Sequence, residues 1–223
     1  MIVRASTAVL VVAALAACAD GGSDDAGAPL VEDPLRFFAT EVVSLTVGEG
    51  GGFHKSDVDD VVTGPPEGAG ELAGSLDVVS LGHQGALIVK LGQDVIDVDG
   101  ADLLVFENAF VSGPRTFVEA VEVALSDDGE TWHTFACTAD APAPNGCAGF
   151  SPVYANSEEN DVDPRDPAVA GGDAFDLADV GLASARYVRL VDVSDEPGDA
   201  GFDTGGADID AVAIVNGAAR DER

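Results

Sequence analysis

Short runs with β-strand character, separated by Gly, Pro, Asp and Asn, dominate the chain beyond residue 35. Residues 185–193 alternate apolar and polar side chains, and Val121, Val123 and Leu125 share one face of another run. Such alternation is typical of strands with one buried face. No long helical period and no repeat of fixed length is evident. The sequence therefore predicts an all-β fold, a sandwich or jelly roll of about eight to ten short strands.

The remaining expected strands follow from the same pattern and cover residues 37–47, 75–81, 86–91, 102–106, 131–135 and 209–215. Residues 82–85, Gly-His-Gln-Gly, separate two of these runs and predict a hairpin. Residues 137–172 are rich in Pro, Asn, Asp and Gly, which predicts a long irregular loop or insertion. Residues 176–179 could start one helical turn. The predicted β domain spans residues 35–217, with a C-terminal tail over 218–223.

The first residues have the pattern of an export signal. Arg4 precedes an apolar run from Ala5 to Ala17, and Asp20 closes the run soon after Cys18. A basic start, an apolar stretch of about 7–15 residues and small residues before the cut are typical of secretory signals. A membrane-spanning helix needs about 20 apolar residues. We therefore expect residues 1–17 to be removed and residues 18–34, which are small and acidic, to form a flexible tether.

The end of this signal, Leu15-Ala16-Ala17-Cys18, resembles the lipobox of bacterial lipoproteins. The resemblance implies that Cys18 is acylated and anchors the chain to a membrane, since each buried methylene adds about 0.8 kcal/mol. In some bacteria an aspartate directly after this cysteine favours retention in the inner membrane. Ala19 holds that position here, which favours a cell-envelope location at the outer membrane. An ordinary signal peptide with a chance cysteine is the alternative.

The net charge of the chain limits the classes of partner that it can bind. Asp and Glu number 41 against 10 Lys and Arg, which gives a net charge of −31. Nucleic acid is excluded as a partner because its phosphates must be neutralised by Lys and Arg. Adsorption onto an anionic lipid surface is disfavoured for the same reason. The acidity is compatible with cation binding, and also with a solvated surface that resists association.

Cys137 and Cys147 remain as a pair once Cys18 is assigned to lipid. The turn-rich segment between them can fold back on itself, and an exported protein lies in an oxidising compartment. We expect a disulfide, which should contribute roughly 3 kcal/mol in the chain-entropy description. A zinc site is the alternative, but no pair of histidines stands at ligand spacing.

Two segments resemble discoidin-type domains of the coagulation factor C type. They are Val121–Trp132, with an Asp-Asp-Gly turn between two alternating strands, and Ala185–Leu190. The resemblance implies the galactose-binding-like fold, a jelly-roll β-sandwich used mainly for binding.

The chain is also similar to a group of bacterial secreted or surface-anchored proteins. The shared motifs are here Ser80-Leu81-Gly82, the Phe-Glu-Asn of residues 105–110, and residues 201–203 followed by 208–212. His83-Gln84 interrupts the glycine run of that group, and residues 204–207 separate its terminal acidic residues. The resemblance covers most of residues 35–216.

Carboxylate and amide oxygens gather in two segments of the chain. The candidate ligands for a structural calcium ion are Asp97, Asp99, Asp102, Glu107, Asn108, Asp208 and Asp210. Calcium takes six to eight oxygens at about 2.3–2.6 Å and tolerates irregular loops. These groups could converge if the strands over 102–106 and 209–215 are neighbours. Aspartates are also common in turns, and Glu107 and Asn108 could instead satisfy backbone groups of a nearby loop.

Trp132 and Tyr154 are candidate ligand-binding residues, because aromatic rings can stack on sugars. Nucleophilic catalysis finds no support: the chain has no Gly-x-Ser-x-Gly elbow, and its three histidines lie in separate contexts. The expected function is a calcium-stabilised, non-catalytic module at the cell surface that binds a glycan or a protein. The step from sandwich to glycan is an analogy of fold. An adhesive or structural envelope protein without a small ligand is the alternative, and a glycoside hydrolase is a third, less favoured reading.

Overall fold

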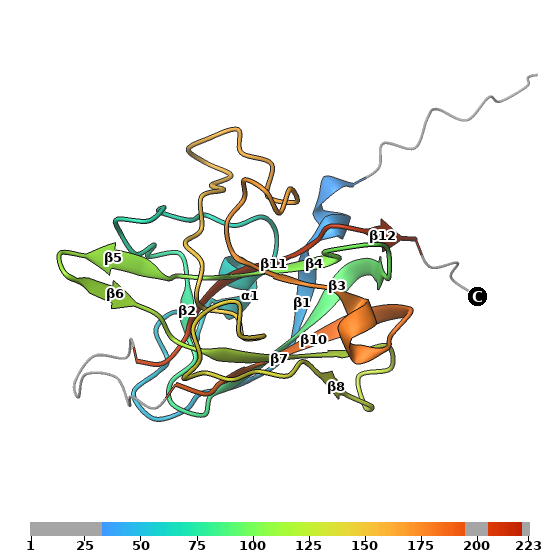
Figure 1. Ribbon diagram of the computed structural model, residues 1–223, viewed down its shortest axis with the longest axis horizontal. Coiled ribbons are helices and arrows are strands. Elements are labelled where there is room, and N and C mark those ends of the chain that lie inside the picture. Colours follow the sequence, from blue (N-terminus) through green and yellow to red (C-terminus); the bar gives the residue numbers. More distant parts are fainter. Residues whose placement is uncertain (1–32, 195–204, 220–223) are drawn as a thin grey trace, which may run out of the picture. The chain divides into compact units, whose positions relative to one another are not determined.

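The computed structural model describes residues 33–194 and 205–219 (Figure 1). These residues belong to one compact unit that begins at Asp33. They form mainly antiparallel β-strands, as the alternating sequence pattern predicts. The helical elements are short: η1 (Pro34–Phe37), α1 (Val58–Val62) and η2 (Leu177–Val180).

The strands form two main sheets and one hairpin. The six-stranded sheet has the order β1–β3–β10–β7–β8, with β12 also paired to β3; its strands are β1 (Ala39–Thr46), β3 (Ala86–Ile96), β7 (Val121–Ser126), β8 (His133–Thr134), β10 (Ser184–Asp192) and β12 (Gly217–Ala218). The four-stranded sheet has the order β2–β11–β4–β9; its strands are β2 (Val79–Ser80), β4 (Leu103–Glu107), β9 (Asp173–Phe175) and β11 (Asp208–Ile214). The hairpin joins β5 (Phe110–Ser112) to β6 (Arg115–Phe117).

The two main sheets share one hydrophobic core, which makes the arrangement a β-sandwich. Val89 of β3 and Val188 of β10 are fully buried in this core beside Val105 of β4 and Ile214 of β11. Alternate residues on β3 and β10 therefore point inward, and those between them, such as Lys90, point outward. The all-β prediction is confirmed at this level.

The four-stranded sheet is buried on both of its faces. On the face away from the core, Leu104 and Phe106 of β4 pack against Val153, Ala155 and Ala170. These last residues belong to the segment between β8 and β9, which contains no extended strand, as expected for residues 137–172. Burial on both sides explains why every residue of β4 is buried and why its sequence is continuously apolar rather than alternating.

Two sequence predictions about the strands are wrong. Residues 75–81 and 86–91 do not form a hairpin, because β2 pairs with β11 in one sheet while β3 pairs with β1 and β10 in the other. The turn at Gly82–Gly85, where Gln84 has a φ of 60°, instead carries the chain from one sheet to the other. The alternation expected along β11 is broken by a bulge between Ile209 and Ala211, so that Ile209 and Val212 face the same core.

Candidate metal centre

The structure divides the predicted calcium ligands between the two ends of β4. Asp97 and Asp102 precede this strand, whereas Glu107 ends it and lies beside Asp208 at the start of β11. A strand rises about 3.3 Å per residue, so the two ends of β4 lie on the order of 15 Å apart. One ion cannot contact both groups, and the expectation that the predicted ligands converge on a single site is wrong. Asp99 lies exposed in the turn before β4.

At the first end of β4, three carboxylates form a group that could hold a metal ion. Asp97, Asp102 and Asp176 place carboxylate oxygens within 4.8 Å of one another. Asp102 is fully buried and already accepts hydrogen bonds from the main-chain N–H of Val98 at 3.1 Å and of Leu177 at 3.0 Å. It therefore also clamps two loops at this end of the sheet.

At the other end, Glu107, Glu119 and Asp208 form the Glu107 cluster. Glu107 is 2% exposed, and its Oε1 accepts a hydrogen bond from the main-chain N–H of Asp208 at 3.2 Å. Its Oε2 is buried and has no hydrogen-bond partner among the described residues. An unpartnered buried carboxylate oxygen is costly. The site therefore contains an acceptor that the described protein atoms leave unsatisfied.

The loop opposite Glu107 approaches it closely through a glycine. A Cβ at Gly149 would lie 3.5 Å from Glu107 Oε2 and 1.9 Å from the carbonyl oxygen of Glu119, so only glycine fits between them. The N–H of Gly149 and the N–H of Phe150 donate to Asp173 Oδ2 at 2.8 and 2.9 Å. This places a further, half-buried carboxylate, at the start of β9, beside the cluster.

The electrostatics of the Glu107 cluster oppose ionisation of its members. Burial raises the pKa of Glu107 well above its usual range, and the charges of Glu119 and Asp208 raise it further. Burial likewise raises the pKa of Glu119 to about 8 and that of Asp208 to about 6, although Ser80 donates a hydrogen bond to Asp208. Among the described residues, no Lys, Arg or His forms an ion pair with the cluster. Its negative charge therefore lacks a compensating cation from the protein.

Two other predicted ligands have structural partners. Both carboxylate oxygens of Asp210 accept from the main-chain N–H of Glu67, at 3.1 and 3.2 Å. The Asn108 side chain accepts from the N–H of Ser75 at 2.6 Å and donates to the carbonyl oxygen of the same residue at 3.2 Å. These contacts tie the segment before β2 to β11 and to the end of β4. Asn108 therefore satisfies backbone groups of a nearby loop, which was the structural alternative to a role as a calcium ligand.

Sequence reasoning missed several acidic residues of these two groups, namely Glu119, Asp173, Asp176 and Asp192. Asp192 could have been identified from the sequence, because it follows Val188 and Leu190 on the side of β10 that faces the core. In the structure it is fully buried. Its Oδ2 accepts from the N–H of Ala207 at 2.8 Å, beside the start of β11. Nothing in the local sequence distinguishes Glu119 from a surface residue.

The remaining predicted residues lie in separate places. Cys137 and Cys147 form the expected disulfide, with an S–S distance of 2.08 Å. Trp132 packs under the guanidinium of Arg189 on the six-stranded sheet, 4.9 Å from its ring centre. Tyr154 is 45% exposed and belongs to the loop that covers the four-stranded sheet, so the two aromatic residues do not form one platform.

Some predictions fall outside the described residues. These are the signal of residues 1–17, Cys18 with most of the tether, and the motif at residues 201–203. Among the described residues, no helix is long and apolar enough to cross a membrane. The chain matches no protein-family model, and no relative is found for it among curated proteins.

Proposed function

We propose that this protein is a calcium-stabilised, non-catalytic binding module, anchored through Cys18 to the outer membrane and displayed on the cell surface. The observation that carries the proposal is the buried, unpartnered Oε2 of Glu107 within a cluster of carboxylates. A divalent cation would satisfy this oxygen and neutralise the charges of Glu119 and Asp208 together. Buried carboxylates are usually paired with a cation or coordinate a metal ion.

The donor set favours calcium over other metals. Glu107, Glu119 and Asp208 offer only carboxylate oxygens, and hard oxygen ligands suit calcium or magnesium rather than zinc. The cluster joins residues from irregular segments and strand ends, which calcium tolerates better than magnesium does. Bound calcium would tie the end of β4, the start of β11 and the segment before β7, which contains Glu119, to one point. This role is structural, so the proposal assigns no reaction to the site.

Thermal unfolding with calcium, magnesium or a chelator tests the metal. Calcium at about 100 times its dissociation constant should stabilise the fold by about 2.7 kcal/mol. For a domain of this size that corresponds to a rise in Tm of about 5–10 °C relative to the chelated protein. We expect a smaller rise with magnesium. An unchanged Tm in calcium would refute the proposed metal.

Two variants assign the calcium effect to a position. Glu107→Gln should abolish the rise in Tm, and in chelator it should be about as stable as the native protein, because burial already keeps Glu107 in its neutral form there. Asp176→Asn changes the Asp97–Asp102–Asp176 group by the same charge and should retain the rise. The opposite pattern would move the calcium site to the other end of β4.

A further inference from the structure

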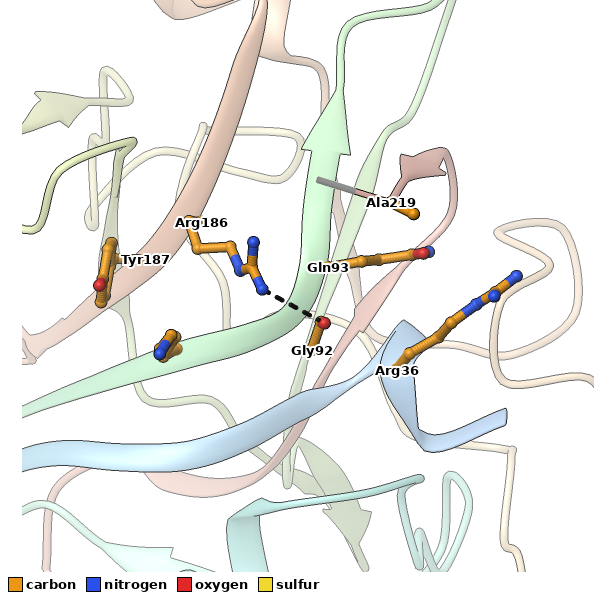
Figure 2. A pocket seen from close by; sticks show the side chains of 7 residues that line it. Arg36, Gly92, Gln93, Arg186, Tyr187 and Ala219 are labelled. Carbon is orange, nitrogen blue, oxygen red and sulfur yellow. Dashed lines mark hydrogen bonds between the residues drawn. The ribbon is translucent and has the colours of Figure 1, made fainter. Parts of the chain in front are cut away.

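Cationic side chains gather in one cavity of this very acidic protein. The whole chain has 10 Lys and Arg. Three of them, Arg36, Lys90 and Arg186, line a single cavity of about 380 Å³. Figure 2 shows Tyr187, Arg186, Gln93 and Arg36 following one another across strand β3. The volume lies in the range of about 300–1,000 Å³ that is common for small-ligand sites.

Arg186 is held in a fixed position at this cavity. Its Nε donates to the carbonyl oxygen of Leu91 at 3.1 Å, and its terminal nitrogens contact the carbonyl oxygen of Gly92 at 3.5 Å and Asp94 Oδ1 at 2.9 Å. These contacts use three of the five N–H donors of a guanidinium. Two donors remain for a ligand, and the group is already oriented before binding. Such preorganisation reduces the entropy that binding costs.

The other polar groups of the cavity are set by strand register. Lys90 of β3 is the cross-strand partner of Tyr187 of β10, and both point away from the core. Lys90 is half-buried and pairs with Glu41 at 3.4 Å, a surface ion pair that a ligand can exchange. Gln93 is 4% exposed and lines the same cavity, and its Nε2 has no hydrogen-bond partner among the described residues. The cavity thus offers an amide donor beside two cations, Arg186 and Lys90, whose ion pairs with Asp94 and Glu41 a ligand would have to share or exchange.

Further along β10, a second pair of a cationic and an aromatic side chain lies on the same face of the sheet. Arg189 lies two residues beyond Tyr187, which is roughly 7 Å along a strand, and stacks on Trp132. A ligand longer than one sugar ring could therefore meet an aromatic ring and a cation twice along this face. Regular spacing of charge and ring surface fits a polymer of anionic sugars better than a single small anion.

We infer that this cavity and the adjoining face of β10 bind an anionic glycan, whose carboxylate or sulfate group meets Arg186 and Lys90 while a sugar ring lies against Tyr187. The inference names the ligand class for the proposed binding module and rests on that function. An anionic membrane is disfavoured, because so extended a surface would also face the acidic remainder of a protein of net charge −31, whereas an oligosaccharide can be confined to the cavity and the adjoining strand.

Isothermal titration with three oligosaccharides of equal length tests the inference. The probes are an oligogalacturonate, a chondroitin sulfate oligosaccharide and a neutral maltooligosaccharide, each added to the full chain in detergent with calcium removed and then restored. We expect the two anionic probes to bind, the neutral probe to bind much more weakly, and affinity to fall as salt increases. The stronger of the two anionic probes identifies the acidic group.

Variants locate the binding surface. Lys90→Gln should lower the affinity for the anionic probe by up to about fivefold, which is the effect of losing one partly exposed ion pair. Arg115→Gln removes the same charge from the exposed strand β6 and should leave affinity unchanged. Tyr187→Ala, which leaves Arg186 and Asp94 in place, should also weaken binding. Equal losses in Lys90→Gln and Arg115→Gln would overturn the location.

The failure of this inference can be told apart from failure of the proposed function. If the native protein binds no anionic probe, or binds the neutral probe equally well, the cavity inference is refuted even when calcium still raises the Tm. If calcium leaves the Tm unchanged while the anionic probe still binds and depends on Lys90, only the calcium role is refuted. Breakdown of either probe during titration would refute the non-catalytic assignment.

Discussion

At the scale of single residues, the carboxylates removed from solvent differ in the hydrogen-bond donors and charges that surround them. Asp102 and Asp173 are ordinary in this respect, because main-chain N–H groups converge on their carboxylates. Glu107 differs, since no described residue donates a hydrogen bond to one of its two buried oxygens. Glu119 and Asp208 surround it with like charge. A group in this state must hold a proton or a cation.

The raised pKa values predict that the calcium-free protein loses stability as pH rises. The folded state keeps the proton on Asp208 up to its pKa of about 6 and the proton on Glu119 up to its pKa of about 8, whereas the unfolded chain releases both above about pH 4. The free energy of unfolding then falls by up to about 1.4 kcal/mol per pH unit for each such proton. Urea unfolding in chelator from pH 5 to 8 measures the slope.

Calcium should reverse this behaviour because it competes with protons for the same oxygens, so its stabilising effect should grow with pH. Glu119→Gln should flatten the decrease between about pH 6 and 8, whereas Glu130→Gln, at an exposed turn, should leave it intact. A free energy of unfolding that stays constant or increases over this range in chelator would contradict the assigned protonation.

At the scale of elements, alternation along the chain was informative where a strand has one buried face. Residues 185–193 were predicted well, because the outer face of β10 is only partly buried. Along β7 the prediction that Val121, Val123 and Leu125 share one face is correct, although Ala124 and Ser126 on its other face are buried as well. The hairpin around residues 82–85 was not predictable, since local turn residues do not state which sheet each flanking run joins. The bulge in β11 likewise depends on its partner β4.

The candidate site was predictable only in part for a related reason. Glu107 and Asp208 were identified because they flank apolar strands, and antiparallel pairing of β4 with β11 brings them together. Glu119 and Asp173 reach the same place through long-range packing of loops, which single-sequence patterns do not encode. The basic cavity was missed because its cations are dispersed over residues 36–186.

The disulfide gives a prediction at this scale. Cys137 and Cys147, which are 10 positions apart in the sequence, close a short loop at the start of the long segment between β8 and β9. Replacing both by alanine should lower the free energy of unfolding by about 3 kcal/mol in the chain-entropy description. Urea unfolding of the double variant and of the reduced native protein should agree. A loss confined to the reduced protein would show that the bond is not the source of the stability.

At the scale of the whole molecule, the two sheets have different roles. The four-stranded sheet is enclosed between the core and the long loop and carries the buried acids at its ends. The six-stranded sheet, which contains β3 and β10 (Figure 1), keeps an outer face on which Lys90 of β3 is the cross-strand partner of Tyr187 of β10 and Arg189 follows two residues further. In our proposals, stabilisation by calcium and recognition of a glycan therefore lie on separate sheets of one sandwich.

Arg36, close to the first described residue, and Ala219, the last, line the same cavity. The two ends of the folded unit therefore meet, and a sandwich of this kind can be cut elsewhere and rejoined. A circular permutant with a short linker from Ala219 to Asp33 and new ends in the Asp127–Glu130 turn should fold with a far-ultraviolet circular dichroism spectrum like that of the native chain. Failure to fold would show that β1 cannot pair with β3 when its N-terminal side is joined to Ala219. Success would mean that evolution or engineering can insert this unit as a loop within another protein.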